Sequence, residues 1–201
     1  MIHVECITVG AIAENCYIVE NTENSECLII DPGDEAQRII RCVGERRPQA
    51  VLLTHAHFDH IGAVDTVCSH YHIPVYVHAE DASKLQDAAG NVSALFGMPM
   101  TIEQHPTILP DRLTLAGMDI EVLHTPGHSA GSVCYILPEG QGIVTGDTLF
   151  ADGYGRTDFP DGSFFQLRHS LRTLFQLTPK MVAYPGHGEP GTAGRDPAED
   201  E

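Results

Sequence analysis

Four side chains that commonly bind metal ions lie within six consecutive residues: His55, His57, Asp59 and His60. They directly follow the apolar run 50–53, which is typical of a buried strand, so the cluster is predicted at the end of a strand. Because residues two apart point the same way in an extended chain, His55 and His57 can bind one ion together. Asp59 and His60 break this alternation and can turn toward a second ion beside the first.

Three more candidate ligands follow later in the chain, each in a tight or glycine-rich context. They are His128 in Thr-Pro-Gly-His, Asp147 in Thr-Gly-Asp and His187 in Tyr-Pro-Gly-His-Gly. Seven nitrogen and oxygen ligands are too many for one tetrahedral ion and about right for two ions that share a carboxylate. The spacing therefore predicts a hydrolase with two metal ions. A non-catalytic metal-binding protein is the alternative, although a purely structural zinc site normally closes its shell with four protein ligands.

Length and composition limit the classes of protein that fit. The 201 residues and a hydrophobic content of 42% predict one globular domain over residues 1–201. No apolar run approaches the roughly 20 residues that span a bilayer, and the first residues do not resemble a signal peptide, so we expect a cytoplasmic protein with no membrane partner. A net charge of −17 disfavours nucleic acid as a partner, because Lys and Arg supply most non-specific affinity for phosphate. The oligomeric state is left open.

The elements that must position the ligands are short. Apolar runs between turn residues predict strands over 4–9, 16–19, 27–30, 50–53, 73–77, 112–116, 120–124, 132–137, 142–145 and 182–184. Apolar spacing predicts helices over 34–45, 60–71 and 163–177, with short helices over 81–88 and 92–96. Strand clusters in both halves, with ligands at strand ends, favour an α/β fold of two sheets packed face to face with helices outside, an αββα sandwich.

Two segments are less regular. Residues 79–108 have two interpretations, an irregular segment that covers the site or a plain surface excursion. Residues 189–201 are rich in Gly, Pro, Asp and Glu, and a frayed tail is predicted there.

The ordered pattern His-x-His-x-Asp-His, then a His, an Asp and a final His, resembles the metallo-β-lactamase superfamily. The resemblance extends from Asp31-Pro32-Gly33 to Pro185-Gly186-His187-Gly188. The stretches Gly146-Asp147-Thr148-Leu149-Phe150 and Gly155-Arg156-Thr157-Asp158-Phe159-Pro160 are similar to the glyoxalase II-related group, in particular to short single-domain hydroxyacylglutathione hydrolases. The resemblance implies a four-layer αββα sandwich and hydrolysis of small acyl-thioesters such as S-lactoylglutathione.

The resemblance also implies a division of the ligands. The first ion would be held by His55, His57 and His128, and the second by Asp59, His60 and His187. Asp147 would bridge the two. Zinc is the first expectation for both ions, with iron or manganese as alternatives, because mixed imidazole and carboxylate ligands suit all three metals.

The expected chemistry follows from such ions. A bound dication lowers the pKa of water from 15.7 to roughly 7, so a hydroxide that bridges the two ions can attack at neutral pH without a Ser or Cys nucleophile. Asp59 is the catalytic candidate, since it can bind metal and orient the attacking oxygen. A thiolate leaves easily, so cleavage of a thioester needs little help from a general acid.

Other residues have two interpretations each. Asp31 either orients the ligand loop by a hydrogen bond or caps a turn. The threonines that flank ligands, Thr54, Thr125 and Thr148, either orient them or cap strands. Arg156 either contacts a small-molecule substrate or pairs with a carboxylate such as Asp158. Phe58 either lines the mouth of the site or packs in the core.

Alternative functions remain open at this stage. Longer glyoxalase II proteins carry a C-terminal helical domain and a Lys-aromatic stretch that contact glutathione. From the length of 201 residues we do not expect that domain here, and Arg156-Thr157-Asp158 takes the place of the stretch. The Arg-Thr-Asp-Phe stretch is also found in iron-dependent persulfide dioxygenases. Those enzymes bind one iron through two His and an Asp, which would be His55 or His57 with His128 and Asp147 here. β-Lactam hydrolysis is not expected, because such enzymes are usually exported.

Overall fold

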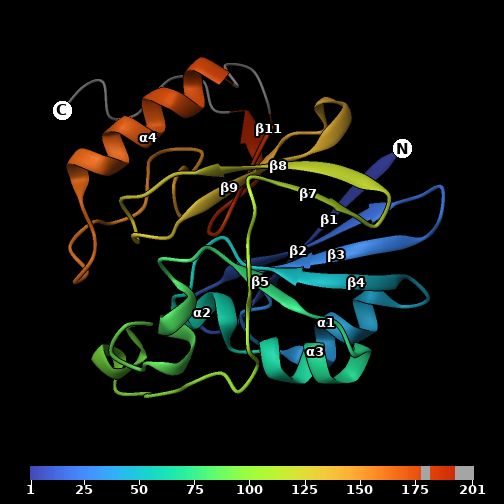
Figure 1. Ribbon diagram of the computed structural model, residues 1–201, viewed down its shortest axis with the longest axis horizontal. Helices are drawn as coiled ribbons and strands as arrows, with labels where there is room; N and C mark the ends of the chain where they lie inside the picture. The colour runs from blue at the N-terminus through green and yellow to red at the C-terminus, as the bar shows by residue number, and fades with distance from the viewer. Residues whose placement is uncertain (178–181, 193–201) are drawn as a thin grey trace.

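The computed structural model describes residues 1–177 and 182–192. Within them the chain forms two six-stranded sheets that pack face to face (Figure 1). The first sheet has the order β1 (Ile2–Val9), β2 (Glu14–Asn21), β3 (Glu26–Ile30), β4 (Arg47–Leu52), β5 (Val75–Val77) and β6 (Thr107–Ile108). The second has the order β12 (Gly191–Thr192), β11 (Val182–Pro185), β10 (Ile143–Gly146), β9 (Val133–Ile136), β8 (Met118–His124) and β7 (Arg112–Leu115).

Helices cover the outer faces of both sheets. In Figure 1, α1 (Ala36–Val43), α2 (Phe58–Ile61) and α3 (Val64–Tyr71) lie below the first sheet, and α4 (Phe164–Leu177) lies above the second. Short 3₁₀ helices η1 (Ala82–Gln86), η2 (Ser93–Phe96) and η3 (Pro138–Gly140) lie in the connections. The predicted four-layer αββα sandwich is therefore confirmed.

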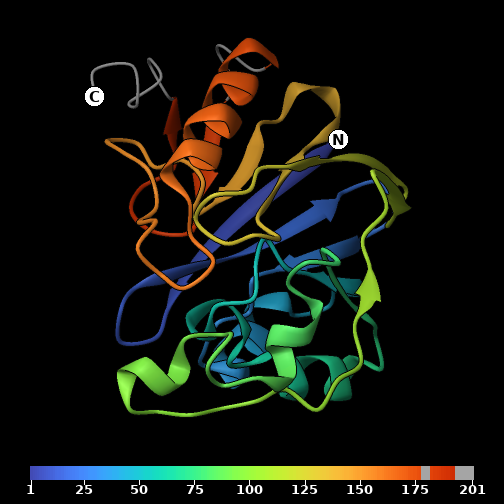
Figure 2. The ribbon, with the colours of Figure 1, turned by 60° about the vertical axis from the view of Figure 1, so that its left-hand side comes forward.

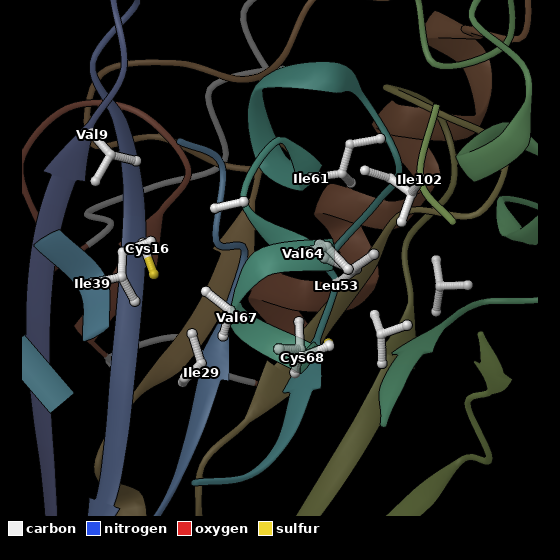
Figure 3. Packing of buried hydrophobic residues seen from close by; sticks show 14 of the residues in the cluster. Val9, Cys16, Ile29, Ile39, Leu53, Ile61, Val64, Val67, Cys68 and Ile102 are labelled. Atoms are coloured by element: carbon white, nitrogen blue, oxygen red, sulfur yellow. The ribbon is translucent and has the colours of Figure 1, made fainter. Parts of the chain in front are cut away.

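The inner strands β2, β3 and β4 of the first sheet are largely buried on both faces, and their side chains alternate between two cores. On β2, Cys16 and Ile18 pack toward α1 and α3, whereas Tyr17 and Val19 pack toward the second sheet. This alternation follows from the two-residue period of a strand. Figure 3 shows the core on the helical side, where Val64, Val67 and Cys68 of α3 lie beside strand residues. A third core joins the second sheet to α4 through Leu167, Leu171 and Leu174.

Most predicted elements are present, with shifted ends. The helix predicted over 60–71 is wrong in its continuity, because the chain forms α2 and α3 separately. The break has a tertiary cause: the Ala63 amide donates to the Pro32 carbonyl at 2.9 Å. The strand predicted from residue 73 begins only at Val75, after Pro74, whose nitrogen carries no hydrogen to donate to a neighbouring strand. The two-residue strands β6 and β12 were not predicted.

The frayed tail expected over residues 189–201 stays a prediction. Gly191–Thr192 form β12, which pairs with β11, so this part of the range 189–201 is ordered in a sheet. Residues 193–201 lie outside the described residues. None of the helices in residues 1–177 and 182–192 is long and apolar enough to cross a membrane. The cytoplasmic location stays a prediction.

Parallel pairing brings the functional loops together. β3 to β6 are parallel in the first sheet, and β10 and β11 are parallel in the second. Because the carboxyl ends of parallel strands meet at one edge, the segments after β3, β4 and β5 emerge side by side, as do those after β10 and β11. Asp31 follows β3, the histidine cluster follows β4, and Asp147 and His187 follow β10 and β11.

Candidate metal centre

The seven predicted ligands converge from four separate loops. His57 Nδ1 lies 2.9 Å from His128 Nε2, and His187 Nε2 lies 3.1 Å from Asp59 Oδ2. Asp147 lies between these groups, with Oδ1 3.5 Å from His60 Nε2 and Oδ2 3.4 Å from His128 Nε2. The two oxygens of Asp147 therefore face different histidines.

The donor atoms form groups that match the expected division. His55, His57 and His128 offer atoms within 4.8 Å of one another, and so do Asp59, His60 and His187. His55, His60 and Asp147 form a third such group that connects the other two. Their roles as ligands stay predictions, but the structure places all seven side chains together.

Buried donor atoms without partners show that these residues fit metal ions. Among the described residues, His55 Nε2, His60 Nε2 and Asp147 Oδ1 are buried and make no hydrogen bond. Such atoms are rare in folded proteins because leaving them unpaired costs free energy. A cation between them would satisfy all three, and imidazole and carboxylate are suitable donors for zinc, iron or manganese.

Two histidines of the first group, His55 and His57, are held in the neutral form that a metal requires. Burial, and then the neighbouring histidines, lower the pKa of His55 well below its usual value. Burial and His128 lower the pKa of His57 to about 3. Neutral imidazoles keep a free lone pair, so this side of the site is prepared for coordination.

The second group attracts positive charge. Burial by itself would lower the pKa of His60, but Asp59, Asp147 and Asp31 outweigh it and raise that pKa well above its usual value. Burial would raise the pKa of Asp147, yet the charge of His60 outweighs it and lowers that pKa. The Asp147 carboxylate therefore stays ionised, and it favours a cation in the space between the histidines.

Asp31 and Thr54 hold the ligand loop through hydrogen bonds. Asp31 accepts hydrogen bonds from the Thr54 amide at 2.7 Å and from its hydroxyl at 2.6 Å. Asp31 Oδ2 also lies 3.0 Å from His60 Nδ1, and Thr54 Oγ1 lies 3.1 Å from His55 Nδ1. When His60 carries its proton on Nδ1, this contact leaves Nε2 free to face the centre. The arrangement is what the orienting interpretation of Asp31 and Thr54 requires.

Thr125 and Thr148 contact each other instead of a ligand. Their hydroxyl oxygens are 2.9 Å apart, and Thr125 Oγ1 lies 3.4 Å from the thiol of Cys134. Both residues are buried. The pair connects the segment before His128 to the segment after Asp147, so any effect on the ligands acts through the backbone of these loops.

Asp81 is a supporting residue that the sequence interpretation missed. This fully buried carboxylate accepts hydrogen bonds from the Ala56 amide at 2.9 Å and the Gly131 amide at 2.8 Å. It also accepts from the Ser129 hydroxyl at 2.9 Å and from Lys84 Nζ at 2.6 Å. Ala56 lies between His55 and His57, and Ser129 follows His128, so Asp81 ties two ligand loops together. Its position after β5, at the edge where β3 and β4 also end, is the signal that could have found it.

Lys84 extends this support. Its ammonium contacts Asp161 as well as Asp81, and Asp161 accepts a hydrogen bond from the Ala130 amide at 2.9 Å. Burial would raise the pKa of Asp161, but the hydrogen bonds from Lys84 and Ala130 lower it. The loop that carries His128 is thus held by two carboxylates around one buried cation.

Glu14 was also missed. Its side chain is 1% exposed, its two oxygens have no hydrogen-bond partner among the described residues, and Oε1 lies 3.7 Å from His60 Nδ1. Burial raises the pKa of Glu14 well above its usual value, which favours a neutral carboxyl behind the ligands.

A glycine is needed at position 186, because the backbone there passes close to the side chains of Asp147 and His60. A Cβ at this position would collide with Asp147 Oδ1 and lie 2.7 Å from His60 Cε1. The glycine therefore allows the loop with His187 to pack directly against the loop with Asp147.

The centre opens into a pocket of about 320 Å³. Its walls include the aromatic side chains of Phe58, Phe96, Phe150 and Phe159. Phe58 therefore lines the mouth, as one interpretation expected, and its ring lies 5.0 Å from that of Phe96.

Arg156 lines the pocket and already has a partner. Its guanidinium donates two hydrogen bonds of 2.6 Å to Asp158 and lies 4.4 Å from the centre of the Phe159 ring. Its backbone carbonyl lies 2.7 Å from His128 Nδ1 and so fixes the orientation of that ring. The salt-bridge interpretation is present in the structure, and the substrate contact stays a prediction.

Comparisons with known proteins agree with this geometry. Residues 9–187 match the family model of the metallo-β-lactamase superfamily. The hydroxyacylglutathione hydrolase GloC of Haemophilus influenzae is 35% identical over 205 residues, which cover 96% of this chain and 94% of that protein.

Two solved structures are similar over nearly their whole length. The BLEG-1 B3 metallo-β-lactamase shares 36% identity with a TM-score of 0.90, over 99% of this chain and 97% of its own. TTHA1623 in a di-iron-bound form shares 36% identity with a TM-score of 0.84, over 94% and 95%. From the family match and these relatives, the chain belongs to the metallo-β-lactamase superfamily, whose fold binds divalent metal ions.

Proposed function

We propose that this chain is a binuclear metal-dependent hydrolase of small acyl-thioesters, of the hydroxyacylglutathione hydrolase type. The observation that carries the proposal is the pair of three-residue donor groups with Asp147 between them. His55, His57 and His128 would hold one ion, and Asp59, His60 and His187 the other. Bound ions of this kind supply a Lewis acid and lower the pKa of water.

The remaining chemistry belongs to side chains at the mouth of the site. Asp59 lines the pocket and accepts a hydrogen bond from His187, so its carboxylate is positioned to orient a reacting water. The aromatic walls make the entrance largely apolar, which limits the contact of the centre with bulk water and strengthens electrostatic interactions there. Arg156 can meet a carbonyl or carboxylate of the substrate if it turns from Asp158.

The lining favours a thioester over an amide. Among the described residues that line the pocket, Arg156 is the only ionisable group apart from predicted ligands. An amine leaving group needs a proton from a general acid, whereas a thiolate leaves without one. A pocket that lacks an independent acid therefore suits thioesters.

Relatives support the substrate class and bear on the metal. GloC is named as a hydroxyacylglutathione hydrolase, which supports S-lactoylglutathione as the first substrate to test. We propose zinc as the metal. The di-iron form of TTHA1623 supports iron as the alternative.

Two other reactions, β-lactam hydrolysis and persulfide oxygenation, are also tested. The similarity to BLEG-1 favours a trial of β-lactams. Persulfide oxygenation by a single iron would use His128 and Asp147 with His55 or His57, which also lie together here.

The test uses protein purified without added metal. Metal content is measured by elemental analysis, and the same sample is assayed with S-lactoylglutathione, a β-lactam and glutathione persulfide. We expect two metal ions per chain and release of free thiol from the thioester. One iron per chain with oxygen uptake would replace the proposal with the dioxygenase, and turnover of the β-lactam alone would replace it with a lactamase. Protein inert toward all three would favour a non-catalytic role.

A further inference from the structure

An apolar hollow adjoins the metal pocket. It has a volume of about 340 Å³ and shares Ile12, Phe58, Asp59 and Phe96 with the lining of the metal pocket. Met98 and Met100 extend it away from the centre. Its volume falls in the range of small-molecule sites, about 300–1,000 Å³. We call this space the Met98 hollow.

The Met98 hollow is built from segments far apart in the sequence. One wall is the turn between β1 and β2, which carries Ile12, and the other is the segment after η2, which carries Met98. Figure 2 shows this turn and the segment around η2 on the same side of the molecule. The floor belongs to the ligand loop, since Phe58 packs against Phe96 and its amide donates to the Asn91 carbonyl at 3.0 Å. The hollow is therefore fixed relative to the candidate metal centre.

Its apolar side chains are unusually exposed. Ile12 is 50% exposed, Phe96 48% and Met98 59%. Neighbouring apolar side chains on the rim of a pocket are typical of a ligand-binding surface. Methionine adapts its shape easily, which suits contact with a flexible chain.

Charge decides which part of a substrate fits the hollow. Of the ionisable residues that line it, Glu14 is favoured in its neutral form, Asp59 is a candidate metal ligand and Asp34 is acidic, and no Lys or Arg is among its described lining residues. The described lining therefore offers an anionic moiety no cationic side chain to pair with. Arg156 lies in the lining of the metal pocket but not in that of the hollow, so an anionic thiol carrier is better placed on the Arg156 side.

We propose that the Met98 hollow binds the apolar acyl chain of the substrate, so that this enzyme prefers acyl groups longer and less polar than lactoyl. The inference rests on the proposed thioester hydrolysis and specifies its substrate class. The thioester carbonyl lies at the metal centre, the acyl chain extends past Phe58 and Phe96, and the thiol carrier extends toward Arg156.

The first test measures hydrolysis by the metal-loaded enzyme. S-acylglutathiones from acetyl to octanoyl are compared with S-lactoylglutathione. We expect kcat/KM to rise about two- to fourfold per added methylene until the hollow is filled, as burial of methylene groups predicts. In Met98→Glu the octanoyl-to-acetyl ratio of kcat/KM should fall close to one. Leu95→Glu is the matched control, because Leu95 lies in the adjacent helix η2, is 65% exposed and does not line the hollow.

The second test measures binding without turnover. S-methyl- and S-octylglutathione are thioethers that cannot be hydrolysed, and their binding is followed by calorimetry. We expect tighter binding and a more negative heat-capacity change for the octyl compound, and loss of this difference in Met98→Glu but not in Leu95→Glu.

The outcomes separate the two proposals. Turnover of every thioester with no dependence on acyl length would overturn the assignment of the hollow and leave thioester hydrolysis intact. No turnover of any thioester would overturn the proposed function, and the thioether measurement would then decide on the hollow alone. Rates of acetyl thioesters that rise with the length of an alkanethiol, but not with acyl length, would place the thiol in the hollow and contradict the inference.

Discussion

The loop after β4 and the segment between β5 and β6 build the same site in different ways. The loop supplies four of the seven candidate ligands within six residues. The segment supplies none of the seven, yet Asp81 holds the backbone of that loop and Phe96 packs on Phe58. One region provides donor atoms, and the other holds them in place and shapes the entrance.

The comparison teaches which parts of a metal site are visible in a sequence. Few residue types bind zinc or iron, so ligands stand out by their type and spacing. A residue that supports the ligand loops can be any buried carboxylate, and a residue that lines the pocket can be any apolar side chain. Neither kind therefore stands out in the sequence. Of the two interpretations of residues 79–108, contacts with Ala56 and Phe58 favour a segment that covers the site.

The strongest test of the donor side of this comparison is Asp147→Ala. This change removes the carboxylate that faces both His60 and His128, so we expect loss of metal from both groups and of nearly all turnover. Metal content by elemental analysis and thiol release measure the two effects. A variant that keeps both metal ions and the full rate would contradict the bridging role.

The supporting side is tested by Asp81→Asn. We expect metal affinity to fall by about 10- to 100-fold, as for other residues that orient ligands, because two ligand loops lose a common anchor. Competition with a chelator measures the affinity. Glu80→Gln is the matched control, since it removes an exposed acidic charge at the adjacent position. Equal metal affinities in Asp81→Asn and Glu80→Gln would show that Asp81 does not support the ligand loops.

A smaller effect is expected from Thr54→Val, which keeps the shape of the side chain and removes its hydroxyl. The buried carboxylate of Asp31 then loses one donor, which should lower the free energy of unfolding by about 1–3 kcal/mol. Chemical denaturation of metal-free protein measures it. Thr66→Val on the exposed side of α3 serves as the control, and an equal change in both variants would count against a special role for Thr54.

The smallest effect concerns Asp161 and depends on pH. Its pKa is lowered in the folded protein, so its pairing with Lys84 stabilises the fold above its unfolded pKa of about 3.9 and is lost as the pH falls through the lower folded value. The difference in unfolding free energy between wild type and Asp161→Asn should be largest at neutral pH and shrink below about pH 4. Denaturation of both proteins in chelator at several pH values measures it. A difference that grows on acidification would show the opposite sign.

Much of the fold was predictable because its strands are regular. Alternation on β2 and the apolar run of β4 follow from burial on both faces, and both strands were predicted with small shifts at their ends. The break between α2 and α3 was not predictable from periodicity, because it depends on the distant Pro32 carbonyl. The 3₁₀ turns near Asp81 and Phe96 are too short to show a period.

The site was predictable to a similar degree. Sequence spacing brought together the seven candidate ligands, and the fold places them within a few ångströms of one another. The residues that support the ligands were harder to predict from the sequence. Asp81 accepts a hydrogen bond from the Ala56 amide, for example, and only the pairing of strands in the sheet brings these two residues close together. Arg156 shows a further limit of prediction from the sequence. The residue type alone did not distinguish a contact with substrate from the pairing with Asp158 that the structure shows.

A crystal structure of the protein grown with ample zinc, with anomalous scattering recorded at the metal edge, tests the central claim most directly. We predict two peaks about 3.5–4 Å apart, one bound by His55, His57 and His128 and the other by Asp59, His60 and His187, with Asp147 between them. A single peak, or side chains turned away from an empty space, would contradict the binuclear site.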